Sequence, residues 1–360
     1  MRFIVTSEGN HSTFGDIFFE VPTEETLIKA EKAVWDLGTD TLSQYVGEQD
    51  KLWQRFETEF RKMCITKTAF HFILLMEIAQ ISLEEGYPVD ILGDAAGSVI
   101  AYLLGITGQD TLPYYINYCA EELLWGLEST PEPLDFSLGI AAEIRPLIHE
   151  KLERKYGSWR SRNDCYRRIS LTDLSWCQSL GELAKLTNRK PTLEDCSNEV
   201  FCRVLKNLAK AYEGIEGFER DEEAYGYRLE DISYVSDFDE LIRIFAYENG
   251  VFGHKKVLSN LQIPDFFVTK DELFSFLIHH GVPRELAADA VKARGFFDRR
   301  DHVKILENYS LPLEIYDWYM EGDYLWSGAE CISRLVFLCY EAWYQNEVAR
   351  RKGSSCQSPK

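Results

Sequence analysis

A loop of small residues at 90–98 (DILGDAAGS) leads into the apolar stretch VIAYLLGIT at 99–107. Loops of this kind at the start of a helix bind phosphate, because unpaired backbone N–H groups point at the anion. This loop carries two aspartates and neither lysine nor arginine. We therefore expect a structural helix entry that has the shape of a phosphate site without its chemistry, with Asp94 as the cap of the helix.

Two carboxylates, Glu132 and Asp135, lie in the proline-bounded segment PEPLDF at 131–136. Paired carboxylates hold the magnesium ions that phosphoryl transfer requires. Residues three apart in an extended strand face opposite sides, however, and Pro133 removes a donor from any strand ladder. We expect both to be solvated loop carboxylates, and we predict no metal site and no cofactor.

The segment 151–168 combines basic residues with Tyr156 and Trp159, a composition that can bind a nucleic-acid backbone. Its cations are Lys151, Arg154, Lys155, Arg160, Arg162, Arg167 and Arg168. The alternative is a charged helix face whose cations pair with the protein's surplus of acidic residues. Both interpretations stay open from the sequence.

The overall charge argues against nonspecific binding of nucleic acid. The chain has 360 residues, with 59 acidic against 39 basic ones, and its net charge is -20. The summed field of such a surface repels a polyanion, so we expect any DNA binding to be weak. The hydrophobic share of 45% excludes a wholly disordered chain.

Several features indicate a soluble cytoplasmic protein without a membrane partner. The N-terminus lacks the apolar core of a signal peptide, and the strongest apolar run, FHFILLMEIAQI, contains a glutamate. The nine cysteines form no C-x-x-C pair, which favours reduced thiols in the core over a zinc site. His254, His279 and His280 lack neighbours at ligand spacing.

Hydrophobic periodicity predicts a predominantly helical α+β protein. Apolar spacing indicates a helical pair over 51–84 that ends at Gly86 and Pro88, and Gly157 ends another helix. Pro283 is expected in the first turn of a helix, and Thr269 with Glu272 fits a capping box. The predicted organisation is a partly extended segment 1–50, a domain 50–213, an acidic junction 214–240, a helical domain 241–350 and a disordered tail 351–360.

The segment 55–115 resembles the catalytic core of bacterial DNA polymerase III alpha subunits of the PolC type. The resemblance is densest in AAGS at 95–98 and AYLLGIT at 101–107. Fainter similarity extends over roughly 50–345, and PEPLDFS stands where the family has its Pro-Asp-Ile-Asp strand. The resemblance implies a reduced palm with a small sheet, followed by a helical fingers-like region.

Measured against this resemblance, the chemistry of the family has been replaced at separate motifs. The family's triphosphate-contacting arginine falls on Leu92 and its serine on Asp94, so Gly93, Asp94, Gly97 and Ser98 are a remnant of a nucleotide site. A leucine makes no charge-assisted contact, and an aspartate repels a triphosphate. In the last fingers motif, the family's lysine and histidine correspond to Gly328 and Glu330.

Three functions are compatible with the sequence. The first is a catalytically defective polymerase homologue that acts as a binding or regulatory protein in DNA replication, with a replication protein as its partner. The second is an active DNA-directed DNA polymerase with a rebuilt site, in which Glu132, Asp135 and an acidic residue from 214–240 hold Mg²⁺. The third is an acidic protein that mimics DNA and binds a replisome component.

Overall fold

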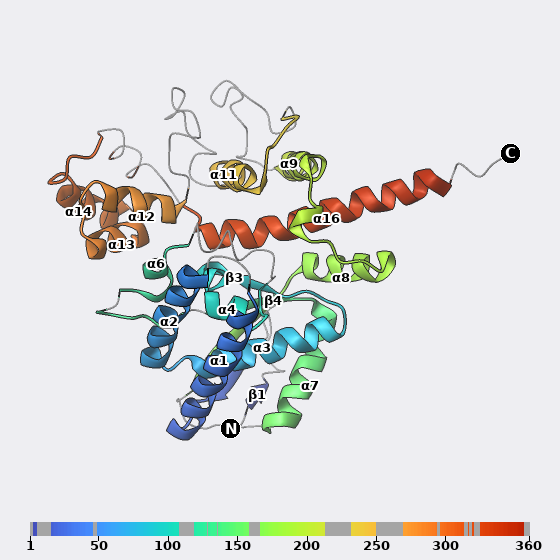
Figure 1. Ribbon diagram of the computed structural model, residues 1–360, viewed down its shortest axis with the longest axis horizontal. Coiled ribbons are helices and arrows are strands. Elements are labelled where there is room, and N and C mark those ends of the chain that lie inside the picture. Colours follow the sequence, from blue (N-terminus) through green and yellow to red (C-terminus); the bar gives the residue numbers. More distant parts are fainter. Residues whose placement is uncertain are drawn as a thin grey trace. The chain divides into compact units, whose positions relative to one another are not determined.

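A computed structural model of the chain shows a mainly helical protein with one small sheet (Figure 1). The structure describes residues 3–5, 16–45, 49–107, 119–127, 129–134, 136–157, 166–212, 232–249, 269–293, 296–312, 316, 319 and 325–355. The predicted α+β fold class is therefore confirmed.

The chain folds into two compact units. Unit 1 comprises Met1–Asn117 and Leu124–Lys190, and unit 2 comprises Tyr118–Leu123 and Pro191–Lys360. The segment 1–50 thus belongs to unit 1, whereas 191–212 groups with unit 2. The acidic junction at 214–240 stays a prediction, because most of it lies outside the described residues.

Unit 1 contains a five-stranded mixed sheet with the strand order β1-β2-β5-β4-β3. The strands are β1 (Phe3–Val5), β2 (Ile17–Glu20), β3 (Asp90–Leu92), β4 (Ser137–Ile140) and β5 (Tyr166–Asp173). β4 and β5 pair in parallel, and the other neighbours are antiparallel. Leu138, Ile140, Ile169 and Leu171 on the two parallel strands are fully buried, as expected for the inner strands of a sheet.

Helices cover this sheet, and the predicted helical pair is confirmed. The helices of unit 1 are α1 (Glu24–Gln44), α2 (Gln49–Thr66), α3 (Ala69–Glu84), α4 (Val99–Leu103), α7 (Arg145–Tyr156) and α8 (Ser175–Thr187). A positive φ of 57° at Lys67 separates α2 from α3. Gly157, with φ of 84°, ends α7 as predicted, because glycine adopts this conformation without strain.

The core of unit 1 joins β2 to α3 through aromatic rings. The ring centroid of Phe19 on β2 lies 5.7 Å from that of Phe70 and 5.0 Å from that of His71. The His71 ring also stacks on the Phe136 ring, with the two centroids 4.9 Å apart. His71 is 4% exposed, and burial, aided by the positive charge of Arg167, lowers its pKa to about 4. This histidine is therefore a neutral core residue.

The described residues of unit 2 form helices joined by turns and loops, with no strand among them. Its helices are α9 (Asn198–Tyr212), α11 (Phe238–Asn249), α12 (Lys270–His279), α13 (Arg284–Lys292), α14 (Phe296–Leu306) and α16 (Gly328–Ser355), with the short η4 (Leu193–Asp195). The long α16 packs against α9, α11 and η4. Its buried face includes Ile332, Leu335, Cys339 and Ala342, which follow helical spacing.

Three local predictions for unit 2 can be compared with the structure. Thr269 caps α12 by accepting a hydrogen bond from the Glu272 amide at 3.2 Å, which is one of the two hydrogen bonds of the predicted capping box. Pro283 is the residue before α13 rather than part of its first turn. The predicted disordered tail is wrong at its start, because α16 continues to Ser355.

Among the described residues, no single helix is long and apolar enough to cross a membrane. The pair Asp50–Thr66 and Ala69–Glu84 passes that test of length and composition only when its two helices are taken together, and they are bent by 110°.

Candidate functional site

The small-residue loop connects β3 to α4 through the 3₁₀ helix η1 (Gly93–Gly97). Gly93 has a φ of 71°, a conformation that glycine adopts without strain. The residue that precedes η1 is Leu92, and no side chain caps it there. The prediction that Asp94 caps this entry is wrong, since Asp94 is the second residue of η1.

A glutamate from a distant part of the sequence holds the end of this loop. Glu59 lies on α2 and is fully buried. Its Oε2 accepts a hydrogen bond from Ser98 Oγ at 2.7 Å, and its Oε1 accepts one from the Val99 amide at 3.3 Å. Glu59 therefore supplies the hydrogen-bond acceptor for the first residues of α4 that a cap within the loop would otherwise supply.

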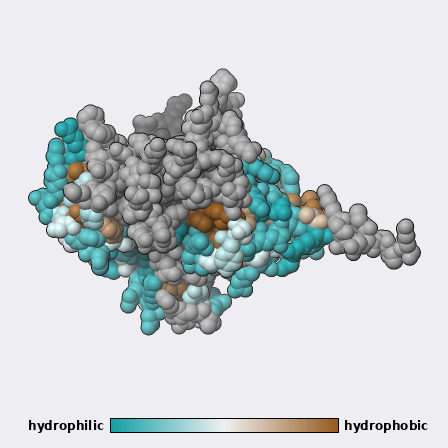
Figure 2. Space-filling model, turned by 90° about the horizontal axis from the view of Figure 1, so that it is seen from above, coloured by the Kyte–Doolittle hydropathy of each residue, from teal (hydrophilic) through white to brown (hydrophobic). Residues whose placement is uncertain are grey.

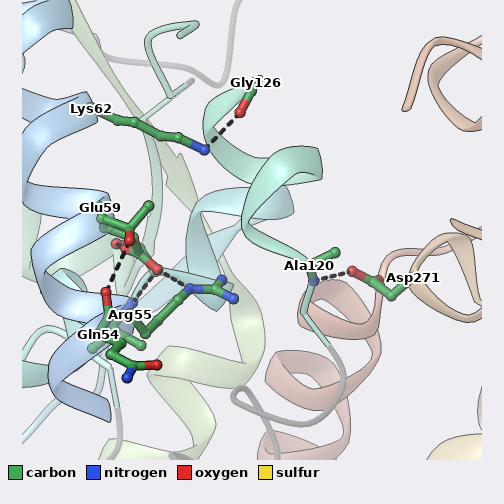
Figure 3. Close-up of polar contacts among 10 residues, drawn as sticks. Gln54, Arg55, Glu59, Lys62, Ala120, Gly126 and Asp271 are labelled. Atoms are coloured by element: carbon green, nitrogen blue, oxygen red, sulfur yellow. Dashed lines mark hydrogen bonds and ion pairs between the residues drawn. The ribbon is translucent and has the colours of Figure 1, made fainter. Parts of the chain in front are cut away.

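Arg55, one turn earlier on α2, neutralises this buried carboxylate. Its Nε donates to Glu59 Oε1 at 2.7 Å, and its side chain is 13% exposed. A second cation of α2, Lys62, is buried and donates from Nζ to the Gly126 carbonyl at 2.9 Å (Figure 3). The two cations thus bind groups of the protein itself beside the loop.

The chemistry of the loop follows from this arrangement. The donors of Ser98 and Val99 are engaged by Glu59, and a phosphate brought to them would approach a buried carboxylate. Like charges at close range in a partly dehydrated site repel each other strongly. This geometry is therefore unfavourable for a triphosphate.

The proposed metal ligands are placed only in part. Glu132 is exposed and lies before β4, at the end of a tight turn in which Gly126 bridges Pro131. Its amide donates to the Trp125 carbonyl at 2.8 Å. Asp135 lies outside the described residues, as do most residues of 214–240. Within the described part of the chain, no group of three or more His, Cys, Asp or Glu side chains could hold a metal ion.

The basic cluster is partly neutralised by carboxylates. Lys151 on α7 pairs with Glu84 at 3.0 Å, and Lys155 pairs with Glu77 at 2.8 Å, both on α3. The hydroxyl of Tyr156 also donates to Glu77, and burial raises the pKa of this tyrosine. These contacts join α7 to α3, as expected for a charged helix face.

The remaining cations of the cluster lie on or near β5. Arg168 lies 3.6 Å from Asp16, and Arg167 is half-buried on the same strand. Arg154 is exposed on α7, whereas Arg160 and Arg162 lie outside the described residues. Figure 2 shows that hydrophilic residues dominate the described surface on one face, with apolar residues in a few patches.

Gly328 and Glu330, which the resemblance predicts as a degenerate fingers motif, lie in the first turn of α16. Ser327 and Glu330 cap α16 reciprocally, because the Glu330 amide donates to Ser327 Oγ at 3.2 Å and the Ser327 amide donates to Glu330 Oε2 at 3.0 Å. The Gly328 amide donates to Asp271 Oδ2 at 2.7 Å. The S-x-x-E spacing could have revealed this cap, whereas no sequence signal connects Asp271 to it.

The fold and this site define a class: an α+β protein in which a glycine-serine loop after a short strand opens a buried helix. Residues 31–222 match the family model described as the bacterial DNA polymerase III alpha NTPase domain. The chain therefore belongs to the DNA polymerase III alpha family, and the predicted resemblance is confirmed. A search of the curated proteins finds no match.

Proposed function

We propose that this chain is a catalytically defective member of the DNA polymerase III alpha family that acts in the cytoplasm as a binding or regulatory protein in DNA replication. The observation that carries the proposal is the state of the small-residue loop. Its last donors bind the buried carboxylate of Glu59. By the resemblance, Leu92 corresponds to the triphosphate-contacting arginine of the family.

A second motif supports the same proposal. By the resemblance, Gly328 and Glu330 correspond to a lysine and a histidine of the family, and in this chain they form hydrogen bonds at the start of α16. Neither a glycine nor a carboxylate bound to its own helix cap can neutralise a developing charge on pyrophosphate. The residues at both motifs have structural roles, so selection for the fold accounts for them without catalysis.

The charge of the chain bears on its partner. Lys151, Lys155 and Arg168 of the basic cluster contact carboxylates, and the net charge of the chain is -20. Such a surface favours a basic protein surface over a DNA backbone. The partner we propose is therefore a protein of the replication machinery, and an acidic surface that competes with DNA for such a protein is the second candidate function.

Primer extension tests the proposal. The purified chain is incubated with primer-template DNA, the four deoxynucleoside triphosphates and Mg²⁺, beside a Glu132→Ala/Asp135→Ala double variant. We expect no extension by either protein. Extension by the unchanged chain that disappears in the double variant would refute the proposal and assign these carboxylates to a rebuilt two-metal site.

A further inference from the structure

Asp271 receives hydrogen bonds from two segments that lie far apart in the sequence. It is the second residue of α12 and is 6% exposed. Its Oδ1 accepts from the Ala120 amide at 2.8 Å (Figure 3), and its Oδ2 accepts from the Gly328 amide at 2.7 Å. All three residues belong to unit 2.

The first of these segments, residues 119–123, is called the strap. It runs into the short helix α6 (Glu121–Trp125) and belongs to unit 2, although unit 1 precedes and follows it in the sequence. Cys119 and Leu123 are buried at its two ends. Glu122 forms an ion pair with Arg284 at the start of α13, and Ala120 donates a hydrogen bond to Asp271 of α12, so the strap contacts both helices.

The second segment is the first turn of α16. Besides the bond from Gly328 to Asp271, the Lys270 amide donates to the Trp326 carbonyl at 3.0 Å, so the starts of α12 and α16 are joined twice. The Cys331 amide donates to the Ser327 carbonyl at 3.1 Å, which is the first backbone bond of this turn.

We propose that Asp271 couples the strap to the first turn of α16, so that each segment is held more firmly while the other is in place. The physical reason is that two donors, one on each oxygen, fix the buried carboxylate in one orientation. When one donor leaves, the side chain gains rotational freedom, and the remaining hydrogen bond must then bear the whole entropic cost of fixing it. Displacement of the strap therefore loosens the start of α16, and the converse holds by linkage.

This coupling is a conformational device that does not depend on the proposed function. Asp271 accepts a hydrogen bond from the strap and another from the first turn of α16, so its carboxylate joins the two segments directly. A protein that displaces residues 119–123 would thus change the order of α16 at a distance, and this gives the strap a regulatory role.

Amide hydrogen exchange of the full chain tests the coupling. The variant Glu122→Gln removes the charge of the strap's ion pair and leaves α16 untouched. We expect exchange to accelerate about fivefold in residues 119–123 and also at Gly328, Glu330 and Cys331, which is the effect of losing about 1 kcal/mol. Arg284→Gln breaks the same ion pair from α13 and must give the same pattern.

Two further variants make the test specific. Glu285→Gln removes an exposed carboxylate beside Arg284 and should leave both segments unchanged. In an Asp271→Asn background, both segments should already exchange faster, and adding Glu122→Gln should affect only the strap. If Glu122→Gln accelerates exchange in the strap alone while Asp271 is present, the coupling does not exist. Unchanged exchange at Leu335 and Cys339, in the buried middle of α16, establishes that unit 2 is folded in each variant.

Discussion

Replacement of Glu59 is the perturbation that the loop geometry predicts most sharply. The Glu59 carboxylate is fully buried, accepts hydrogen bonds from Ser98 and Val99, and balances the charge of Arg55. Glu59→Ala leaves a buried cation without this counter-charge and removes the acceptor of two donors. Breaking a buried ion pair from one side costs about 3–5 kcal/mol, so we expect the free energy of unfolding to fall by about 4 kcal/mol.

Two matched variants separate charge from shape. Glu59→Gln preserves the volume and one carbonyl acceptor but removes the charge, and we expect a loss of about 2 kcal/mol. Glu57→Gln removes an exposed carboxylate on the same helix and should change the free energy of unfolding by less than about 0.5 kcal/mol.

Urea denaturation followed by far-UV circular dichroism measures these differences through the midpoint of the transition. A double-mutant cycle with Ser98→Ala adds a direct measure of the contact, since the two effects should be strongly non-additive. An unfolding free energy for Glu59→Ala within about 1 kcal/mol of the unchanged chain would refute the reasoning, because a buried carboxylate that binds the loop cannot be removed so cheaply.

Three further outcomes follow from the described contacts. His71 has a pKa of about 4 in the folded chain and 6.5 in an unfolded one, so the unfolded state binds the proton first as the pH falls. The free energy of unfolding is therefore unaffected at pH 7 and falls by about 3 kcal/mol as the pH drops from 6.5 to 4. His71→Phe, which can retain the ring contacts, should flatten this part of the pH profile of the urea midpoint. A Cβ at Gly139 would lie 1.8 Å from Leu174 Cδ1, so Gly139→Ala should lower the thermal midpoint by an amount corresponding to about 1–3 kcal/mol, whereas an unchanged midpoint would show that α8 repacks freely. Lys151→Ala/Lys155→Ala should leave the fluorescence anisotropy of labelled primer-template DNA unchanged, because both lysines are paired with carboxylates, and a weakened binding curve would assign the basic cluster to DNA.

The parts of the fold that depend on local pattern could be predicted from the sequence. The apolar spacing of 51–84 places α2 and α3, and Gly157 ends α7 where glycine can adopt a positive φ. Neither β5 nor α8, which occupy the segment 166–187, was predicted from the sequence. The eight-residue strand β5 pairs with β2 on one side and with β4 on the other, and both partners are distant in the sequence. Such pairing leaves no local signal.

In the candidate site, too, local motifs could be predicted from the sequence, whereas contacts between distant residues could not. The loop at 90–98 was recognisable from residue types and spacing, whereas Gly328 and Glu330 were singled out only by the resemblance to the family. Their actual partners, Glu59 and Asp271, lie 39 residues before Ser98 and 57 residues before Gly328, so only the tertiary structure brings them together. The sequence offered Asp94 as a cap because it is the nearest carboxylate, but a more distant carboxylate holds the start of the helix.

Direct binding of a deoxynucleoside triphosphate is the measurement that bears most closely on the account. Isothermal titration calorimetry of the full chain with a deoxynucleoside triphosphate and Mg²⁺ should show no saturable binding, because the loop offers a leucine, an aspartate and donors engaged by Glu59. The same titration of a Leu92→Arg/Asp94→Ser variant measures how much affinity the family's two residues restore. Saturable, Mg²⁺-dependent binding to the unchanged chain would contradict the central claim and show that this loop still holds a triphosphate.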